Sequence, residues 1–153
     1  MKRAGIYQLK DRIFIHPWQL TETGLGMGTD PYVSLPFEVE PVDLGKAALD
    51  ALKQSGRTIP HPTEWKAQGA ARLKAAGVKT EKAFQTKASY VCLELRGGQI
   101  LVDPSRNGGT KGDSKGFEAI AGFTIPVEAD APAVDLGNAI CKGLRISHEQ
   151  SNL

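Results

Sequence analysis

Short apolar runs, separated by polar or glycine-containing segments, dominate both ends of the chain. Runs of about four to eight residues rich in branched and aromatic side chains are typical of strands. The sharpest turn signal is Gly97-Gly98 between two such runs, because both glycines accept the positive φ of a tight hairpin turn. The pattern predicts strands over residues 6–9, 13–15, 32–35, 90–95, 99–103 and 117–125.

Two segments between and after these strands have apolar residues at helical spacing, and both begin with the sequence Val-Asp-Leu-Gly. Residues 42–55 recur as residues 134–147, with seven of 14 positions identical. Each segment therefore predicts a short amphipathic helix. Gly45 and Gly137 weaken these helices by about 0.8–1.0 kcal/mol each relative to Ala. We expect that each glycine lets its helix pack closely on a sheet, where a β-carbon would not fit.

Further matches precede the two helical segments in the same order. Ile13–Pro17 matches Ile100–Pro104, and Leu35-Pro36 matches Ile125-Pro126, with an offset that drifts from 87 to 92 residues. Three matches in one order indicate a duplicated unit of strands followed by a helix. We therefore expect an α+β fold with two antiparallel sheets in a single domain. Its predicted parts are pseudo-repeats at about 5–56 and 88–147, joined by a helical connection at 57–87, within a domain of residues 1–153.

The connection between the repeats has its own start and stop signals. Thr63 follows two prolines and can cap a helix that runs to about Ala76. Gly77 then supplies a left-handed cap, and Thr80 can start one more short helix through Phe84. The segment after the second repeat, residues 147–153, is polar and is expected to be frayed.

Composition is that of an ordinary globular protein, with 41% hydrophobic and 24% charged residues. The net charge of +2 does not imply a nucleic-acid partner, but residues 57–87 carry seven basic and only two acidic side chains. This basic segment is either a solvated helix face or a patch for an anionic partner. Without a long apolar run or a signal-peptide core, the chain is expected in the cytoplasm. Cys92 and Cys141 are expected to be small buried side chains, not a bridge.

Catalytic and metal-binding patterns are missing from the sequence. His16, His61 and His148 are scattered and lack metal-ligand spacing. Two glycine-rich stretches, residues 24–28 and 107–116, superficially resemble phosphate-binding loops, but a strand follows each, so both are interpreted as turns. We expect no catalytic residue, no metal site, no cofactor and no enzymatic activity.

One family matches the order of the remaining motifs. The chain resembles the contact-dependent growth inhibition (CDI) immunity proteins, the CdiI family, over about residues 13–145. The most specific part is Pro60-His61-Pro62 with Trp65, followed by Ala75–Lys79 at this distance. The other matching motifs are Gly24-Leu25-Gly26, Pro31-Tyr32, Asp43-Leu44-Gly45, Leu52, Ser55, Phe84, Pro104, Gly116-Phe117 and Asp135-Leu136-Gly137.

The resemblance implies a bacterial cytosolic protein that binds the C-terminal toxin domain of the CdiA effector stoichiometrically, at about 1:1. That toxin is commonly a nuclease. The resemblance also implies a whirly-like fold with two antiparallel sheets, in which an exposed sheet edge could accept a toxin strand. Because specificity in such proteins varies, the shared motifs are interpreted as scaffold, with Gly45 and Gly137 needed for packing and Trp65 in the core.

Recognition is expected in the loops that differ between the repeats, residues 20–30 and 107–116, because loops on a rigid frame commonly carry binding residues. An equally weighted alternative places binding on the basic helix near Lys66 and Lys74. The runner-up function is single-stranded nucleic-acid binding, and a hydrolase is a weaker third. The predicted partner-binding residues are Trp18, Glu22, Tyr32, Arg106, Lys111, Asp113 and Glu118.

Overall fold

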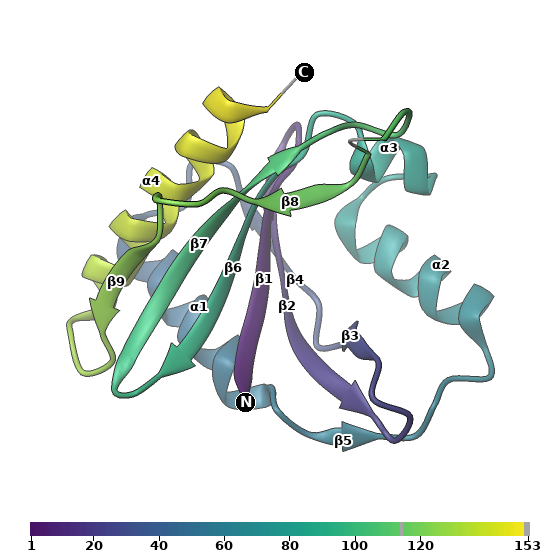
Figure 1. Ribbon diagram of the computed structural model, residues 1–153, viewed down its shortest axis with the longest axis horizontal. Coiled ribbons are helices and arrows are strands. Elements are labelled where there is room, and N and C mark those ends of the chain that lie inside the picture. Colours follow the sequence, from purple (N-terminus) through teal and green to yellow (C-terminus); the bar gives the residue numbers. More distant parts are fainter. Residues whose placement is uncertain (114, 152–153) are drawn as a thin grey trace.

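A computed structural model describes residues 1–113 and 115–151, and within that part the chain forms strands and helices in one mixed fold (Figure 1). The strands are β1 (Lys2–Gln8), β2 (Arg12–Thr21), β3 (Gly26–Gly28), β4 (Val33–Pro36), β5 (Thr58–Ile59), β6 (Ser89–Arg96), β7 (Gln99–Asn107), β8 (Phe117–Ala119) and β9 (Ile125–Glu128). The helices are α1 (Pro41–Gln54), α2 (Trp65–Ala76), α3 (Glu81–Gln85) and α4 (Ala133–Gln150). The predicted α+β class is confirmed.

The strands join one continuous curled sheet, not the two sheets that the sequence suggested. Its main order is β3-β2-β1-β6-β7-β8, and β4, β5 and β9 pair at its flanks. The centre is the antiparallel pair β1–β6, with Gly5 opposite Cys92. This pairing joins the two halves, so their strands share one hydrogen-bonded surface. The predicted turn at Gly97-Gly98 is confirmed, since both residues have positive φ, +57° and +81°.

The two halves contribute equivalent elements in the same order. Strand β2 pairs with β4 along its first part and with β3 along its last part. Strand β7 likewise pairs first with β9 and later with β8. A long helix ends each half, α1 after β4 and α4 after β9. This arrangement is compatible with the repeat read from the sequence, and an origin by duplication, like the whirly-like relationship, stays a prediction.

The two long helices cover one face of the sheet and cross each other at two glycines. A β-carbon on Gly45 would overlap the carbonyl oxygen of Ala133, and one on Gly137 would overlap that of Pro41. Close packing at both glycines is therefore confirmed, but the partner of each helix is the other helix, not the sheet. Below the crossing lies the main apolar core, which includes Ile6, Ile15, Leu44, Val91, Leu93, Val102, Leu136, Ile140 and Leu144.

The opposite face of the sheet carries a smaller, largely aromatic cluster. Tyr7 lies at its centre, with ring centroids 4.5 Å from Tyr90 and 4.9 Å from Phe84 of α3. Two cap predictions for this side are confirmed. Gly77 has φ +74° at the end of α2, and the Thr80 hydroxyl accepts a hydrogen bond from the Ala83 backbone N–H.

Several local predictions were wrong. The strand expected over residues 117–125 is two separate strands, β8 and β9, because they pair with different parts of β7. The expected turn at residues 24–28 contains β3, which pairs with the end of β2. Helix α4 continues to Gln150 with Ser147 fully buried, so the described part of the expected frayed segment is ordered. Residues 152–153 lie outside the described residues. Cys141 is exposed and Cys92 only part-buried, although both are free thiols as expected.

Candidate functional site

The predicted partner-binding residues fall into groups at opposite ends of the sheet. Strand β2 runs antiparallel to β1, β1 to β6, and β6 to β7. The last part of β2, which contains Trp18 and is followed by Glu22, therefore lies at one end of the sheet. The end of β7, where the loop with Lys111 and Asp113 begins, lies at the other end. The two loops in which recognition was expected, residues 20–30 and 107–116, therefore lie at opposite ends of the sheet.

Four of the predicted residues belong to the β7–β8 hairpin. Arg106 and Glu118 are paired in register, and the Arg106 guanidinium donates to the Glu118 carboxylate at 2.9 Å. Lys111 and Asp113 lie beyond them in the exposed connecting loop. Arg106 is part-buried while Glu118 is exposed, so this pair offers its carboxylate more than its guanidinium to a partner.

Asn107, which the sequence analysis did not single out, fixes the base of that loop. Its side chain is fully buried and donates to the backbone carbonyls of Gln85 at 2.7 Å and Ala88 at 2.8 Å. Its side-chain oxygen accepts from the Gly109 N–H at 2.8 Å. A buried, fully bonded amide holds its neighbours in one arrangement, so the β7–β8 loop is attached to the end of α3.

The remaining predictions lie close to the start and inner side of α2. Tyr32 stacks on Phe14 with centroids 5.6 Å apart and lines a cleft of about 640 Å³ beneath α2. Glu22 lies in the turn after β2, and its N–H donates to the Ile59 carbonyl at 2.9 Å. The next residue, Thr23, hydrogen-bonds the His61 ring at 2.7 Å. Both predictions therefore border the segment that leads into α2.

Trp18 is the exception, because it lies away from α2 on the exposed part of the sheet face. It lines a hollow of about 330 Å³ together with Arg3, Tyr90 and Cys92. Its indole Nε1 is buried and has no hydrogen-bond partner within residues 1–113 and 115–151. The ring is part-buried and packs edge-on against His16, with centroids 5.1 Å apart. Trp18 therefore mainly packs against the aromatic rings of this sheet face.

His16 occupies a slot between two glycines of neighbouring strands. A β-carbon on Gly28 would overlap its ring, and one on Gly5 would lie 2.9 Å from it. Burial lowers the pKa of His16 to about 4, so the ring is neutral at pH 7. The Pro17 carbonyl can only accept a hydrogen bond, and its 3.0 Å contact with Nδ1 therefore places the ring proton there. A neutral, enclosed imidazole of this kind supports packing and not proton transfer.

The other titratable groups of this face also favour structure over catalysis. Burial raises the pKa of Tyr7, Tyr90 and Cys92 above their ordinary values, so all three stay neutral. Within the described residues, no group of three or more His, Cys, Asp or Glu side chains could hold a metal ion. In the same part of the chain, none of the helices is both long and apolar enough to cross a membrane.

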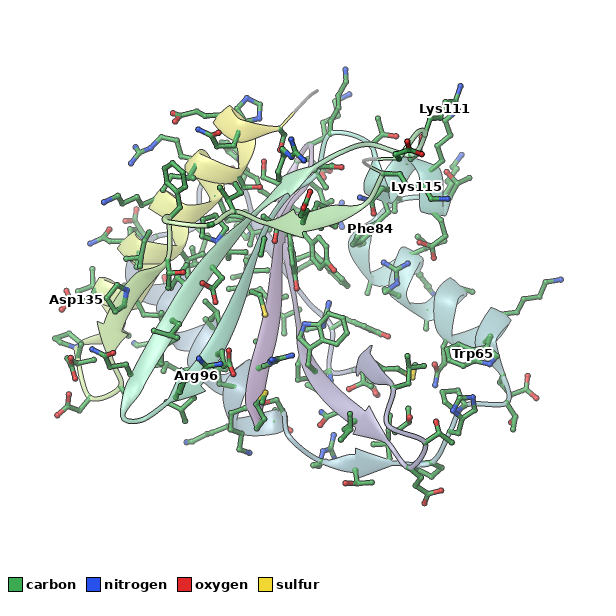
Figure 2. The ribbon with its side chains drawn as sticks, viewed as in Figure 1. Trp65, Phe84, Arg96, Lys111, Lys115 and Asp135 are labelled. Carbon is green, nitrogen blue, oxygen red and sulfur yellow. The ribbon has the colours of Figure 1, made fainter. Side chains whose placement is uncertain are left out.

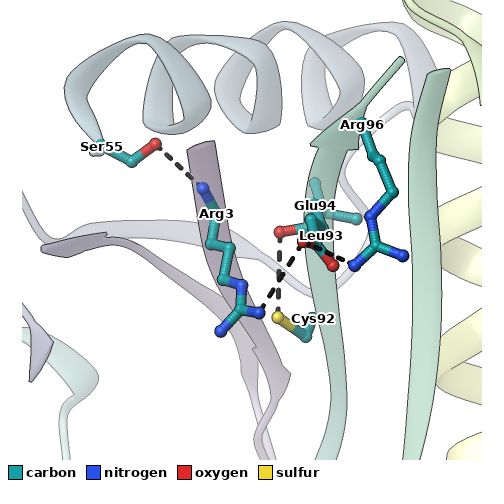
Figure 3. Close-up of polar contacts among 6 residues, drawn as sticks. All are labelled: Arg3, Ser55, Cys92, Leu93, Glu94 and Arg96. Atoms are coloured by element: carbon teal, nitrogen blue, oxygen red, sulfur yellow. Dashed lines mark hydrogen bonds and ion pairs between the residues drawn. The ribbon is translucent and has the colours of Figure 1, made fainter. Parts of the chain in front are cut away.

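A short ladder of charges crosses the uncovered part of the sheet. Glu94 of β6 is bracketed by Arg96 at 3.0 Å and by Arg3 of β1 at 3.7 Å (Figure 3). The carboxylate is largely buried while both guanidiniums remain accessible. This arrangement satisfies Glu94 internally. Asp103 of the neighbouring strand β7 lies opposite Cys92 and not opposite Glu94.

The connection between the halves forms a basic projection beside the sheet, residues 57–87, hereafter the arm. The prediction that Trp65 lies in the core was wrong. Trp65 is at the start of α2, where its side chain is 50% exposed and contacts the His61 ring edge-on. Figure 2 shows Trp65 at one end of α2, with Lys111 and Lys115 beside α3 toward the other end. The arm thus spans the distance between the two groups of predicted residues.

Charge is distributed unevenly between the arm and the rest of the molecule. The arm and the β7–β8 loop (residues 108–116) together carry nine basic and three acidic side chains, a net of +6. The total is +2, so the rest of the chain carries −4. Within the described residues, every ion pair is made by an arginine. The lysines of this surface are therefore available to an acidic partner, and five of them gather around α3 and the loop: Lys79, Lys82, Lys87, Lys111 and Lys115.

One family model matches this chain, and solved structures share its fold. A family described as CdiI, CDI immunity protein, matches residues 2–147. No curated protein matches the chain in sequence. A protein of unknown function from Neisseria meningitidis, NMB0488, is similar in structure with TM-score 0.76 and 19% identity, over 95% of this chain and 94% of that one. A chain of the CdiA-CT/CdiI toxin and immunity complex from Yersinia pseudotuberculosis has TM-score 0.67 and 16% identity, over 96% of each chain.

Proposed function

The chain belongs to the family of CDI immunity proteins, and from this premise we propose that it neutralises the C-terminal toxin domain of a CdiA effector. It binds that domain at about 1:1 in the cytoplasm of the bacterium that makes both proteins. The toxin it blocks is a nuclease. The protein acts by occupying the toxin's surface and has no catalytic step of its own.

The family match over residues 2–147 is the observation that carries this proposal, because it includes every element from β1 into α4. The similar chain in a toxin and immunity complex adds support for the fold. The character of the described residues agrees with a binding role, since the titratable groups of the aromatic face are buried and neutral. An inhibitor made beside a toxin must dissociate rarely, and nuclease–immunity pairs reach Kd values of roughly 10⁻¹³–10⁻¹⁶ M.

For the contact surface we propose the β7–β8 hairpin and the residues that border the arm. Arg106, Lys111, Asp113 and Glu118 supply polar contacts at one end, and Glu22 supplies one at the other. Tyr32 offers an apolar edge in the cleft beneath α2. Trp18 contributes from the neighbouring hollow in the sheet. All seven residues predicted from the sequence thus remain candidates.

The test is binding and protection with the C-terminal domain of the CdiA-type protein encoded beside this chain. The two proteins are produced together, separated and recombined, and the affinity is measured by calorimetry or competition. Growth of cells that express the toxin reports protection. We expect tight binding at one site and restored growth. Absence of binding by the folded wild-type protein would refute the proposed function.

A triple variant tests the hairpin. Arg106→Glu, Lys111→Glu and Asp113→Lys together should weaken toxin binding at least about tenfold, which corresponds to about 1.4 kcal/mol. Lys111 and Asp113 are exposed and should not affect the melting temperature. Arg106→Glu places two carboxylates opposite each other at Glu118 and should lower the melting temperature slightly, so Arg106→Glu alone is melted and titrated as the matched control. Full affinity and full protection by the triple variant would place the interface elsewhere. A reproducible nuclease or esterase turnover, removed by a point mutation in this chain, would contradict the absence of catalysis.

A further inference from the structure

We propose that the arm is the central docking element for the toxin, with Trp65 as its apolar anchor and the surrounding lysines facing an acidic surface of the toxin. This inference rests on the proposed immunity function and assigns its interface. It joins two alternatives that the sequence left separate, the hairpin loop and the basic helix, into one continuous surface.

The packing of α2 shows that its outer side is not needed for the fold. Of its twelve residues only Ala76 is buried. Trp65 leaves half of its surface exposed, although a tryptophan ordinarily gains much from burial. Exposed tryptophans that contact little of their own chain are typical anchors of protein interfaces. The His61 ring holds one edge of the indole, so the anchor is already oriented before a partner arrives.

The arm also connects the two separated groups of candidate residues. At its start, the Thr23–His61 hydrogen bond joins it to the turn that carries Glu22. At its end, Asn107 joins α3 to the loop that carries Lys111 and Asp113. Internally, Arg72 pairs with Glu81 and lies 4.4 Å above the Phe84 ring. A partner seated along α2 and α3 would therefore reach from the turn with Glu22 to the loop with Lys111. Figure 2 shows Trp65 and Lys111 toward opposite ends of this stretch.

Charge identifies the chemistry of the partner surface. The arm and the β7–β8 loop carry a net of +6, and complementary potentials steer association and fix orientation. The matching toxin surface is therefore acidic. A basic inhibitor surface cannot imitate the phosphates of a nucleic acid. The toxin is accordingly held outside its phosphate-binding groove and not by imitation of its substrate.

A nucleic-acid partner fits this surface less well. Single-stranded nucleic acids are bound by several aromatic rings on which successive bases stack. Among the arm and loop residues described, the exposed aromatic rings are Trp65 and the adjoining His61, which meet edge-on, whereas Phe84 is buried in the cluster under α3. A single platform with scattered lysines suits a protein surface with one apolar pocket and acidic surroundings.

The experiment compares arm variants with matched changes on the opposite side of the molecule. Trp65→Ala should weaken binding of the cognate toxin domain by about thirtyfold, the effect of an anchor residue. Phe123→Ala removes an aromatic residue that is 38% exposed near β9 and should leave affinity unchanged. Lys66→Glu with Lys82→Glu should weaken binding, more so at low salt, whereas Lys46→Glu with Lys142→Glu on α1 and α4 should not.

A second variant keeps the test valid if Trp65→Ala alters α2. Ala71→Glu leaves Trp65 in place but puts bulk and negative charge on α2 beside the cleft, and it should also reduce affinity with an unchanged melt. If the wild type binds the toxin and the arm variants bind it with the same affinity, this inference is overturned. The proposed immunity function would then stand unchanged. Loss of affinity for a fluorescent oligonucleotide, with toxin binding unchanged, would overturn it in favour of a nucleic-acid surface.

Discussion

The two helical layers on either side of the sheet are built in different ways. Helices α1 and α4 touch backbone to backbone at Gly45 and Gly137 and bury a continuous apolar core. Helix α2 buries one residue, and a cleft of about 640 Å³ separates part of it from the sheet. Each layer has two helices, but only the α1–α4 layer packs closely along its length.

The difference separates a layer that holds the fold together from the layer that we propose binds the toxin. Interiors at crystal-like density resist even small changes of volume, so the α1–α4 layer has little freedom to change. The arm is attached through His61 at its start, through Ala75 and Ala76 at the end of α2, and through Phe84 near its own end. The outer side of α2 can present new side chains while the sheet and the long helices stay the same.

The largest effect is expected where the two long helices meet. Gly45→Val or Gly137→Val forces a side chain against a backbone carbonyl that cannot move alone, and overpacking together with lost helix propensity should cost about 3 kcal/mol or more. Urea unfolding of the purified variants measures this cost. Unfolding free energies within error of the wild type would show that the crossing is not tight.

Acid should weaken the aromatic face through His16. Its pKa is about 4 in the folded protein against an ordinary value of 6.5, so between these values the unfolded chain binds a proton that the folded chain does not. Stability is therefore complete above pH 6.5 and declines as the pH falls toward 4, by about 3 kcal/mol in total. The measurement is the unfolding free energy at successive pH values.

The control for this pH dependence is His16→Gln, which removes the titrating ring. Between pH 6.5 and 5, above the range of most carboxyl groups, the slope should flatten in this variant. An unchanged slope would assign the acid sensitivity to other groups.

The attachment of the β7–β8 loop to α3 should have an intermediate effect. Asn107→Ala leaves the buried carbonyls of Gln85 and Ala88 without their donor, at a cost of about 2 kcal/mol. Amide hydrogen exchange of residues 108–113 should become faster. Asn138→Ala on the exposed side of α4 is the matched control and should change neither quantity. Slow exchange in the Asn107 variant would mean that the loop is held by other contacts.

The smallest expected effect is a gain in stability from a substitution on α2. The nearest neighbour of a β-carbon on Gly69 would be a Glu81 carboxylate oxygen at 3.8 Å, an ordinary van der Waals contact. Gly69→Ala should therefore stabilise the protein by at most about 0.8–1.0 kcal/mol, the difference in helix propensity. A rise in melting temperature here, with a fall for the equivalent change at Gly45, would show the contrast between the layers directly. Destabilisation by Gly69→Ala would reveal packing around α2 beyond the contacts described.

Local chemistry made much of the fold predictable. The turn at Gly97-Gly98 and the caps at Gly77 and Thr80 depend on residues close in sequence, and all three are confirmed. Close packing at Gly45 and Gly137 was also predicted, because a glycine inside a helix needs a reason. The partner of each glycine was misjudged, since periodicity identifies an apolar face but not the element that covers it.

The candidate site was harder to predict because its parts are far apart in sequence. The loops after β2 and β7 look equivalent along the chain, yet antiparallel pairing sends them to opposite ends of the sheet. Trp65 was assigned to the core because tryptophan usually gains from burial. The near absence of an apolar stripe around it on α2 was the available sign of exposure. Asn107 could not be recognised, since its bonds join segments 19 and 22 residues away.

The central pairing of β1 with β6 also determines when the sheet can be completed during synthesis. Strand β1 begins at Lys2 and β6 at Ser89, so the first half emerges well before its neighbour. At roughly 5–20 residues per second, the ribosome needs about 4–17 s to make the intervening chain. During that interval one edge of β1 lacks its partner strand. Until β6 is made, the backbone N–H and C=O groups along this edge of β1 are free to pair with other strands, so the first half is open to mispairing during that interval.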